Sequence, residues 1–258
     1  MKLFRRIRHK LILDNKKIQY LKYALGEIVL VVIGILIALQ INNWNQSIKD
    51  KNYLDEYLIK IKSHTSEDIQ QLEELSKGRK QIADLCKKAR NSILNKTENE
   101  NLFLFKISGV AFVDFYFKPN SGGYESLKNS QYYGKINNTK LDSLLAKYYG
   151  LVDIIAENER SYNQYAVQQE NYLDMQFDRS LILASAFMSL DSLATKATPQ
   201  SEYDQAFIEY TGKPAYRNVI SLAAWQFDTM IEQYHQLIEL GNLIIEEIDA
   251  TTADLKRI

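Results

Sequence analysis

The sequence contains few residues that crosslink a chain or interrupt helices. Its 258 residues include one cysteine, 3 prolines and 10 glycines. The single cysteine, Cys86, excludes an intramolecular disulfide and any zinc or iron–sulfur site that needs several cysteines. So little proline and glycine argues against a many-stranded β architecture, which requires frequent turns. The composition therefore predicts a helical protein.

Catalytic motifs are also lacking. No GxSxG, GxxxxGK[ST] or GxGxxG pattern occurs, so serine-hydrolase, P-loop and dinucleotide-binding functions have no support. The three histidines, His9, His64 and His235, are too few and too scattered for a zinc site of the HExxH type. We therefore expect no enzyme activity, no cofactor and no metal ion.

Positive charge is concentrated at the N-terminus. The chain has 32 basic and 32 acidic residues, but residues 1–22 hold eight basic residues and one acid, Asp14. The remainder is left with 24 basic and 31 acidic residues, so it lacks the positive surface that nucleic-acid binding requires. The basic leader is expected either to lie as a short amphipathic helix against lipid headgroups or to act only as a charge cluster that sets the topology. A lipid bilayer is thus a predicted partner and nucleic acid is not.

Residues 23–41 form a long apolar run that is interrupted only near its ends, by Glu27 and Gln40. As a helix, these nineteen residues would extend roughly 28 Å, enough to cross the hydrocarbon core of a bilayer. Bulky residues follow the run where a signal peptidase would need small ones, so we expect an uncleaved signal anchor. Because basic residues are retained on the cytoplasmic side, residues 1–22 are predicted to be cytoplasmic and residues 42–258 to lie beyond the membrane.

Two features of the predicted span suggest a role beyond anchoring. Glu27 is an ionisable residue in an apolar segment, which suggests proton handling or a pairing contact. The alternative is that its carboxylate reaches the headgroups, since it lies close to the cytoplasmic end. Gly34 and Ala38 form a small-xxx-small pair that would allow two such helices to pack closely.

The span also carries a family resemblance. Residues 26–45 read GEIVLVVIGILIALQINNWN and, with the basic leader, resemble an uncharacterised Bacteroidota family of single-span membrane proteins, known as a domain of unknown function. Residues 124–130, YESLKNS, and 145–149, LAKYY, are similar to looser motifs of that family. The resemblance implies a Gram-negative inner membrane and a periplasmic helical domain. It supplies no catalytic residues.

Beyond the span, apolar residues recur every three or four positions in three stretches, as expected for one face of a helix. The first stretch contains Leu58, Ile61, Ile69, Leu72, Leu75, Ile82, Leu85, Ala89 and Ile93, with Thr65 and Arg79 at weaker positions. The second contains Leu141, Leu144, Tyr148, Leu151, Ile155, Asn158, Tyr162, Tyr165, Gln169 and Tyr172. The third contains Ile220, Ala224, Phe227, Ile231, Tyr234, Ile238, Gly241, Ile245 and Ile248. The predicted fold is all-α: an N-terminal transmembrane helix followed by an elongated antiparallel helical bundle with coiled-coil spacing.

Two connecting stretches have a different character. Residues 102–117 are rich in phenylalanine, and we expect either a buried cap on the bundle or an exposed surface that binds a partner. Residues 195–214 are expected to form a connecting arm with a short helix at about 203–210.

The second half of the middle stretch is unusually polar for a core. Asn158, Tyr162, Tyr165, Gln169 and Tyr172 fall at positions where buried hydroxyls and amides need hydrogen-bond partners. They are candidates for a small-ligand pocket between helices. The alternative is a wetter, looser end of the bundle.

Three hypotheses for the function remain. The first is a membrane-anchored periplasmic interaction or scaffold protein, which binds another membrane or periplasmic protein or associates with itself. The second is a ligand-sensing module that uses the Tyr-rich positions and acts with a partner, because some 22 cytoplasmic residues leave no room for an output domain. The third is an accessory subunit of an ion- or proton-driven complex that uses Glu27.

Overall fold

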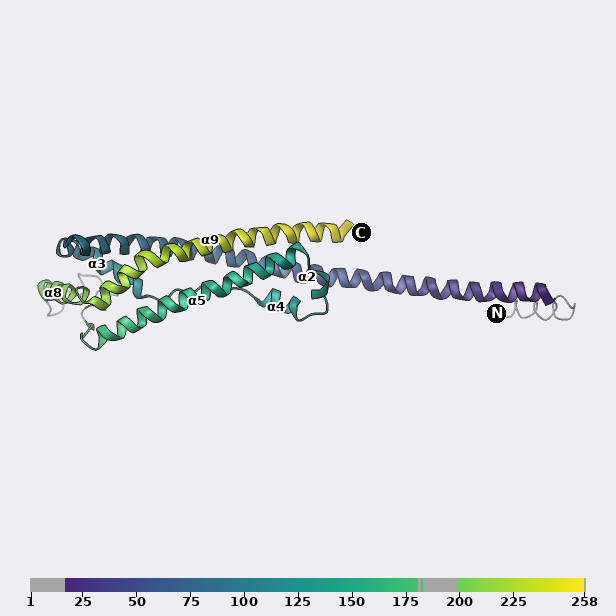
Figure 1. The fold of residues 1–258 in the computed structure, drawn as a ribbon, viewed down its shortest axis with the longest axis horizontal. Helices are drawn as coiled ribbons and strands as arrows, with labels where there is room; N and C mark the ends of the chain where they lie inside the picture. The colour runs from purple at the N-terminus through teal and green to yellow at the C-terminus, as the bar shows by residue number, and fades with distance from the viewer. Residues whose placement is uncertain (1–16, 181, 183–198, 258) are drawn as a thin grey trace. The chain divides into compact units, whose positions relative to one another are not determined.

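The computed structural model describes residues 17–180, 182 and 199–257, and every regular element within them is a helix (Figure 1). The all-α class predicted from the sequence is confirmed. The chain divides into two compact units, Met1–Glu56 and Tyr57–Ile258. Of the predicted leader, residues 1–22, the first sixteen lie outside the described residues.

The first unit contains the apolar segment of helix α2, which spans Lys17–Asn95 as a whole. Apolar side chains from Leu25 to Ile41 are exposed all around this part of the helix, and none of its apolar window is buried. A helix that is apolar on every side and unburied within its own protein is typical of a membrane span. It is the one helix of the described residues that is long and apolar enough to cross a bilayer.

The second unit is built on three long helices: residues 57–95 of α2, α5 (Lys140–Asp174) and α9 (Pro214–Arg257). Figure 1 shows them side by side. Ion pairs join α2 to α9 at Lys62–Asp249, 2.5 Å, and at Lys87–Asp228, 2.7 Å. The residue numbers rise on α2 as they fall on α9, so these two helices are antiparallel.

Helix α5 runs parallel to α2. Tyr148 of α5 contacts Asp68 of α2, and Glu159 contacts Arg79 further along both helices. Two neighbouring helices can be parallel only if the chain between them returns along the bundle. Residues 96–139 make this return.

The helix ends have local causes. After α2, Lys96 adopts a left-handed conformation, φ 58°, and Thr97 N–H donates to Ser92 O at 3.0 Å, which turns the chain out of the helix. At the start of α5, the Thr139 hydroxyl accepts a hydrogen bond from Asp142 N–H and so caps a free amide of the first turn.

The returning connection is mostly short helices. It consists of η1 (Glu98–Asn101), α3 (Leu102–Ser108), η2 (Gly109–Phe112), α4 (Gly122–Lys128) and η3 (Tyr133–Lys135). Between η2 and α4, residues 113–120 form neither a helix nor a paired strand, and we call them the crossing segment. The phenylalanine-rich stretch, residues 102–117, is partly buried in the bundle: Phe105 and Phe117 are buried, but Phe103 is 73% exposed.

Before α9, helix α8 (Gln200–Thr211) includes the short helix expected at residues 203–210. Helix α9 then packs closely on α2 at Gly241. A Cβ at this glycine would lie 3.1 Å from Ile69 Cδ1 and 3.2 Å from Thr65 Cγ2. The absence of a side chain thus allows the two helices to approach.

Buried positions in α2 and α5 follow the three-to-four spacing but include polar residues. In α2, Thr65, Asp68 and Arg79 are 3%, 1% and 1% exposed. In α5, the buried residues after Ile155 are Glu159, Tyr162, Asn163, Ala166 and Leu173. The observed face of α5 is therefore displaced by about one residue from the predicted series through Asn158, Tyr165 and Gln169.

Candidate functional site

The most concentrated group of polar side chains surrounds the crossing segment. Because this segment has no strand partner, its backbone N–H and C=O groups need other hydrogen-bond partners when buried. Side chains of α2 and α5 provide them. Phe117 N–H donates to Glu159 Oε2 at 2.9 Å, Lys118 N–H to Gln71 Oε1 at 2.6 Å, and Asn120 N–H to Asp68 Oδ1 at 2.8 Å.

Carbonyl groups of the connection are bonded in the same way. Phe115 O accepts hydrogen bonds from Arg79 Nη2 at 3.0 Å and Asn163 Nδ2 at 3.1 Å. Ala111 O, just before the crossing segment, accepts one from the Tyr162 hydroxyl at 2.7 Å. Helix side chains therefore supply hydrogen-bond partners that this segment does not find in a sheet or a helix of its own.

At the centre of this group lies a buried charge pair. Arg79 and Glu159 are each 1% exposed, and Arg79 Nη2 lies 3.5 Å from Glu159 Oε1. Tyr234 of α9 joins them: its hydroxyl accepts from Arg79 Nε at 2.7 Å and donates to Glu159 Oε1. Burial, with the Glu159 carboxylate beside it, raises the pKa of Tyr234, so its hydroxyl keeps its proton.

Aromatic rings enclose the guanidinium group of Arg79. Its Cζ lies 4.8 Å from the ring centre of Phe227 and 5.9 Å from that of Phe115. Nη1 of Arg79 is buried and makes no hydrogen bond to the described residues. Cation–π contacts with the two rings therefore stabilise the buried guanidinium charge. A charge held this tightly specifies one arrangement of α2, α5, α9 and the crossing segment.

A second polar group lies near the other end of the crossing segment. Asp68 accepts hydrogen bonds from Asn120 and, at 3.0 Å, from the Tyr148 hydroxyl. Burial raises the pKa of Asp68, although these hydrogen bonds and the nearby His64 oppose the rise. His64 Nδ1 lies 3.1 Å from Asn120 O and accepts from Gly123 N–H at 3.2 Å.

These polar groups are structural in form. Arg79, Glu159 and Tyr234 have almost no exposed surface, so no substrate can contact them while the bundle is folded this way. In the part of the chain that the structure describes, no three or more His, Cys, Asp or Glu side chains are grouped so as to hold a metal ion. Burial raises the pKa of Cys86 to about 12, which keeps it a protonated and poorly reactive thiol.

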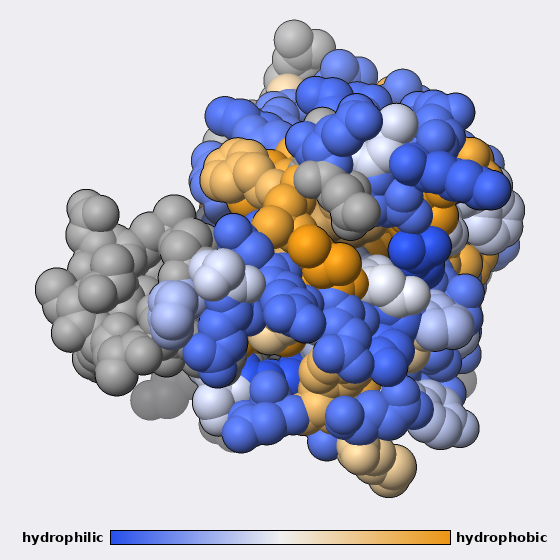
Figure 2. All heavy atoms as spheres, turned by 90° about the vertical axis from the view of Figure 1, so that its left-hand side faces the viewer, coloured by the Kyte–Doolittle hydropathy of each residue, from blue (hydrophilic) through white to orange (hydrophobic). Residues whose placement is uncertain are grey.

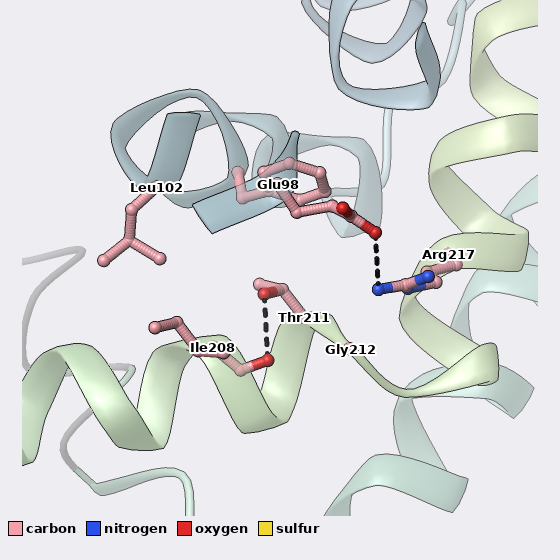
Figure 3. Close-up of a pocket in the computed structure, with 7 residues that line it drawn as sticks. Glu98, Leu102, Ile208, Thr211, Gly212 and Arg217 are labelled. Carbon is pink, nitrogen blue, oxygen red and sulfur yellow. Dashed lines mark hydrogen bonds and ion pairs between the residues drawn. The ribbon is translucent and has the colours of Figure 1, made fainter. Parts of the chain in front are cut away.

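An accessible feature lies at the end of the second unit where α2 ends. Here η1, α3, α8 and the start of α9 surround a cavity of about 200 Å³, shown in Figure 3. Its walls are Glu98, Leu102, Phe105, Ile208, Thr211, Gly212 and Arg217. Arg217 Nη2 donates to Glu98 Oε1 at 3.0 Å, whereas Arg217 Nε is buried without a hydrogen-bond partner in the described residues.

Exposed apolar side chains of α2, α3 and α8 occur at this end of the second unit, where Figure 2 shows apolar surface, and one of them, Ile208, lines the cavity. Leu94 is 71% exposed, Phe103 73% and Ile208 42%. Together with the cavity they form what we call the end surface. A cavity of this size is smaller than most small-molecule sites but can accept one side chain.

The candidate residues in the span lie on one side of α2. Gly34 follows Glu27 by seven residues and Ala38 follows it by eleven, spacings that return to the same helical face. Gly34 and Ala38 are exposed, and space is open beside Gly34. Glu27 lines a hollow on this surface with Ala24, Ile28, Val31 and Val32.

The candidate pocket residues in α5 point in different directions. Tyr162 is buried, bonded to Ala111 O, and packs on Phe227 with ring centres 4.7 Å apart. Asn158 is half-buried and donates to Gln233 at 3.0 Å. Tyr165 and Gln169 are also half-buried, whereas Tyr172 is 58% exposed. Tyr162 and Tyr172 therefore do not face one enclosed space, and a ligand pocket here stays a prediction.

Sequence reasoning missed Asp68, Glu159 and Asn163 as core residues. Spacing alone held a usable signal, since Asp68 lies three residues after Thr65 and eleven before Arg79, in register with the apolar face of α2. A basic residue in register on one helix and an acidic residue on another would have suggested a buried pair.

Residues 27–180 match a family of unknown function, DUF6090. The chain belongs to this family. The match begins within the span and continues through α5, so it includes the crossing segment together with Asp68, Arg79 and Glu159. No curated protein and no solved structure gave a significant match.

Proposed function

We propose that the protein is a single-span inner-membrane protein whose helical bundle, on the periplasmic side, binds another protein through the end surface. The end surface carries this proposal, because exposed apolar side chains and a small open cavity at one end of the bundle are typical of a contact that buries a partner's side chain. The buried charges are occupied internally, which leaves surface binding as the role that the bundle supports best.

Charge asymmetry supports the proposed orientation. The eight basic residues before the span favour a cytoplasmic N-terminus, since only Lys49 and Lys51 lie within the ten residues after it. Lys51→Cys and Arg5→Cys variants test it, since the buried Cys86 gives little background. A membrane-impermeant maleimide should label Lys51→Cys in cells with a permeabilised outer membrane and label Arg5→Cys only after lysis. The reverse pattern would overturn the topology.

The partner is expected to insert one side chain into the cavity, whose walls combine apolar residues with the Glu98–Arg217 ion pair. Removal of a central apolar anchor typically costs about 2 kcal/mol or more of binding energy, roughly a thirtyfold loss of affinity. Leu94→Ser combined with Phe103→Ser should therefore strongly reduce recovery of partners from mild detergent.

Trp225→Ser is the matched control, because Trp225 is 66% exposed on α9 and lies outside the end surface. Equal recovery by both variants would refute binding at the end surface. A fragment of residues 1–50 provides a second comparison. If this fragment recovers the same partners as the full chain, binding is through the span.

The shared face of Glu27, Gly34 and Ala38 favours a second candidate function, an accessory role within a proton- or ion-driven membrane complex. It predicts that Glu27→Gln abolishes the function of the complex while membrane insertion is unchanged. An unaltered phenotype in this variant would remove the hypothesis.

A further inference from the structure

Helix α4 is capped by a side chain from another helix. The first amides of any helix have no acceptor within it, and a side chain at the N-cap normally supplies one. In α4 the N-cap is Ser121, whose side chain makes no capping hydrogen bond. Gly123 N–H instead donates to Nδ1 of His64, in α2, at 3.2 Å.

The same nitrogen has a second partner of opposite kind. Asn120 O, the last carbonyl of the crossing segment, lies 3.1 Å from His64 Nδ1. An imidazole nitrogen carries either a lone pair or a hydrogen, so Nδ1 can accept from Gly123 or donate to Asn120, but not both at once. The two contacts are mutually exclusive.

We infer that His64 is a proton-controlled cap: neutral, it accepts from Gly123 and holds the start of α4, and protonated, it releases Gly123 and donates to Asn120 O. Imidazole is the side chain that ordinarily changes charge between pH 5 and 8. The change transfers one hydrogen bond from α4 to the crossing segment.

The exchange takes place with little room for the ring to move. A Cβ at Gly123 would lie 3.3 Å from His64 Nδ1 and 3.2 Å from Ile61 N, so the ring and α2 are packed against the α4 backbone. Glycine at position 123 permits this close approach. The switch is consequently a change of hydrogen-bond partner and not a rotation of the side chain.

Charged and titratable groups of α2, α4 and α5 lie near His64. Asp68 on α2 interacts electrostatically with His64, an interaction that lowers the pKa of Asp68. From α4, the Gly123 N–H points toward Nδ1. The other titratable groups of this region are Glu125 and Tyr124 on α4 and Tyr148 and Tyr149 on α5. Burial raises the pKa values of both α5 tyrosines, so they stay neutral at these pH values.

Nuclear magnetic resonance of the full-length protein in detergent micelles tests this directly. Between pH 8 and pH 5, protonation of His64 Nδ1 should coincide with an upfield shift of the Gly123 amide proton. The hydrogen-exchange protection factor of Gly123, corrected for intrinsic rates, should fall roughly three- to tenfold, as expected for the loss of one hydrogen bond.

Two variants distinguish the cap from general effects of pH. His64→Asn keeps an acceptor near the position of Nδ1 but does not titrate, so protection of Gly123 should no longer depend on pH. His235→Asn changes an exposed histidine of α9 and should preserve the dependence seen in the unaltered chain. Two results would overturn the inference: a hydrogen on Nδ1 already present at pH 8, or a Gly123 amide that does not follow His64 protonation.

Discussion

Replacement of Glu159 by glutamine should destabilise the bundle severely. In the folded chain one carboxylate oxygen accepts from Tyr234 and faces Arg79, while the other accepts from Phe117 N–H at 2.9 Å. A glutamine offers one acceptor and one donor where two acceptors are required. Whichever way its amide is turned, an N–H group faces another donor, and the charge of Arg79 loses its partner.

The expected loss follows from the burial of the pair. Both side chains are 1% exposed, so water cannot compensate the guanidinium group. Removing one partner of a buried ion pair typically costs about 3–5 kcal/mol. The free energy of unfolding of a domain is usually about 5–15 kcal/mol, so this is a large part of it. Urea unfolding of the full chain in detergent micelles, followed by circular dichroism, measures this as a lower midpoint with an unchanged slope.

The same helix provides a matched control. Glu157 pairs with Arg160 at 2.5 Å, but the two side chains are 68% and 56% exposed, so Glu157→Gln should change stability by less than about 1 kcal/mol. If Glu159→Gln differs from it by less than about 1 kcal/mol, the argument from burial is wrong. Arg79→Met should also couple with Glu159→Gln, the double variant losing about 1–3 kcal/mol less than the sum of the single variants.

Four further substitutions and reactions test other parts of the packing. Gly241→Leu should lower the melting temperature in thermal unfolding, because the new side chain would push α9 from α2 at a cost of about 1–3 kcal/mol. Gly78→Ala, where space is open, should raise it through a gain of about 0.5–1 kcal/mol. Cys86 should react with Ellman's reagent at pH 8 only after unfolding, and rapid reaction of the native chain would contradict its burial. Burial raises the pKa of Asp68 above its ordinary value of 3.8. Between the two pKa values the folded chain keeps the Asp68 proton that the unfolded chain has lost, so the free energy of unfolding falls as pH rises through the raised pKa. Unfolding free energies measured from pH 3.8 upward should therefore decline less in Asp68→Asn than in the unaltered chain.

Much of the fold was predictable because the three-to-four spacing of apolar residues indicates a helix. The third apolar series, from Ile220 to Ile248, lies within α9, and the short helix expected at residues 203–210 lies within α8. The apolar run of the span needed only its length and composition. These features depend on local sequence, which a single chain records fully.

The register of α5 was harder to predict because two helical faces compete there. A series through Asn158, Tyr165 and Gln169 follows the aromatic residues, but the bundle buries Glu159 and Asn163. Hydrophobicity ranks a tyrosine above a glutamate, so the sequence pattern favours the wrong face. Only the presence of Arg79 on α2 makes a buried Glu159 favourable, and that contact joins residues 80 positions apart.

One physical requirement accounts for the polar residues that interrupt the apolar series. The crossing segment lies against α2 and α5 without a strand beside it, so its buried amides and carbonyls need side-chain partners. Asp68 and Glu159 accept from its amides, and Arg79 and Asn163 donate to its carbonyl at Phe115. Had these four residues been apolar, helices α2 and α5 would pack equally well by spacing but could not hold the segment that connects them. The parallel arrangement of α2 and α5 needs that connection, and the polar core follows from it.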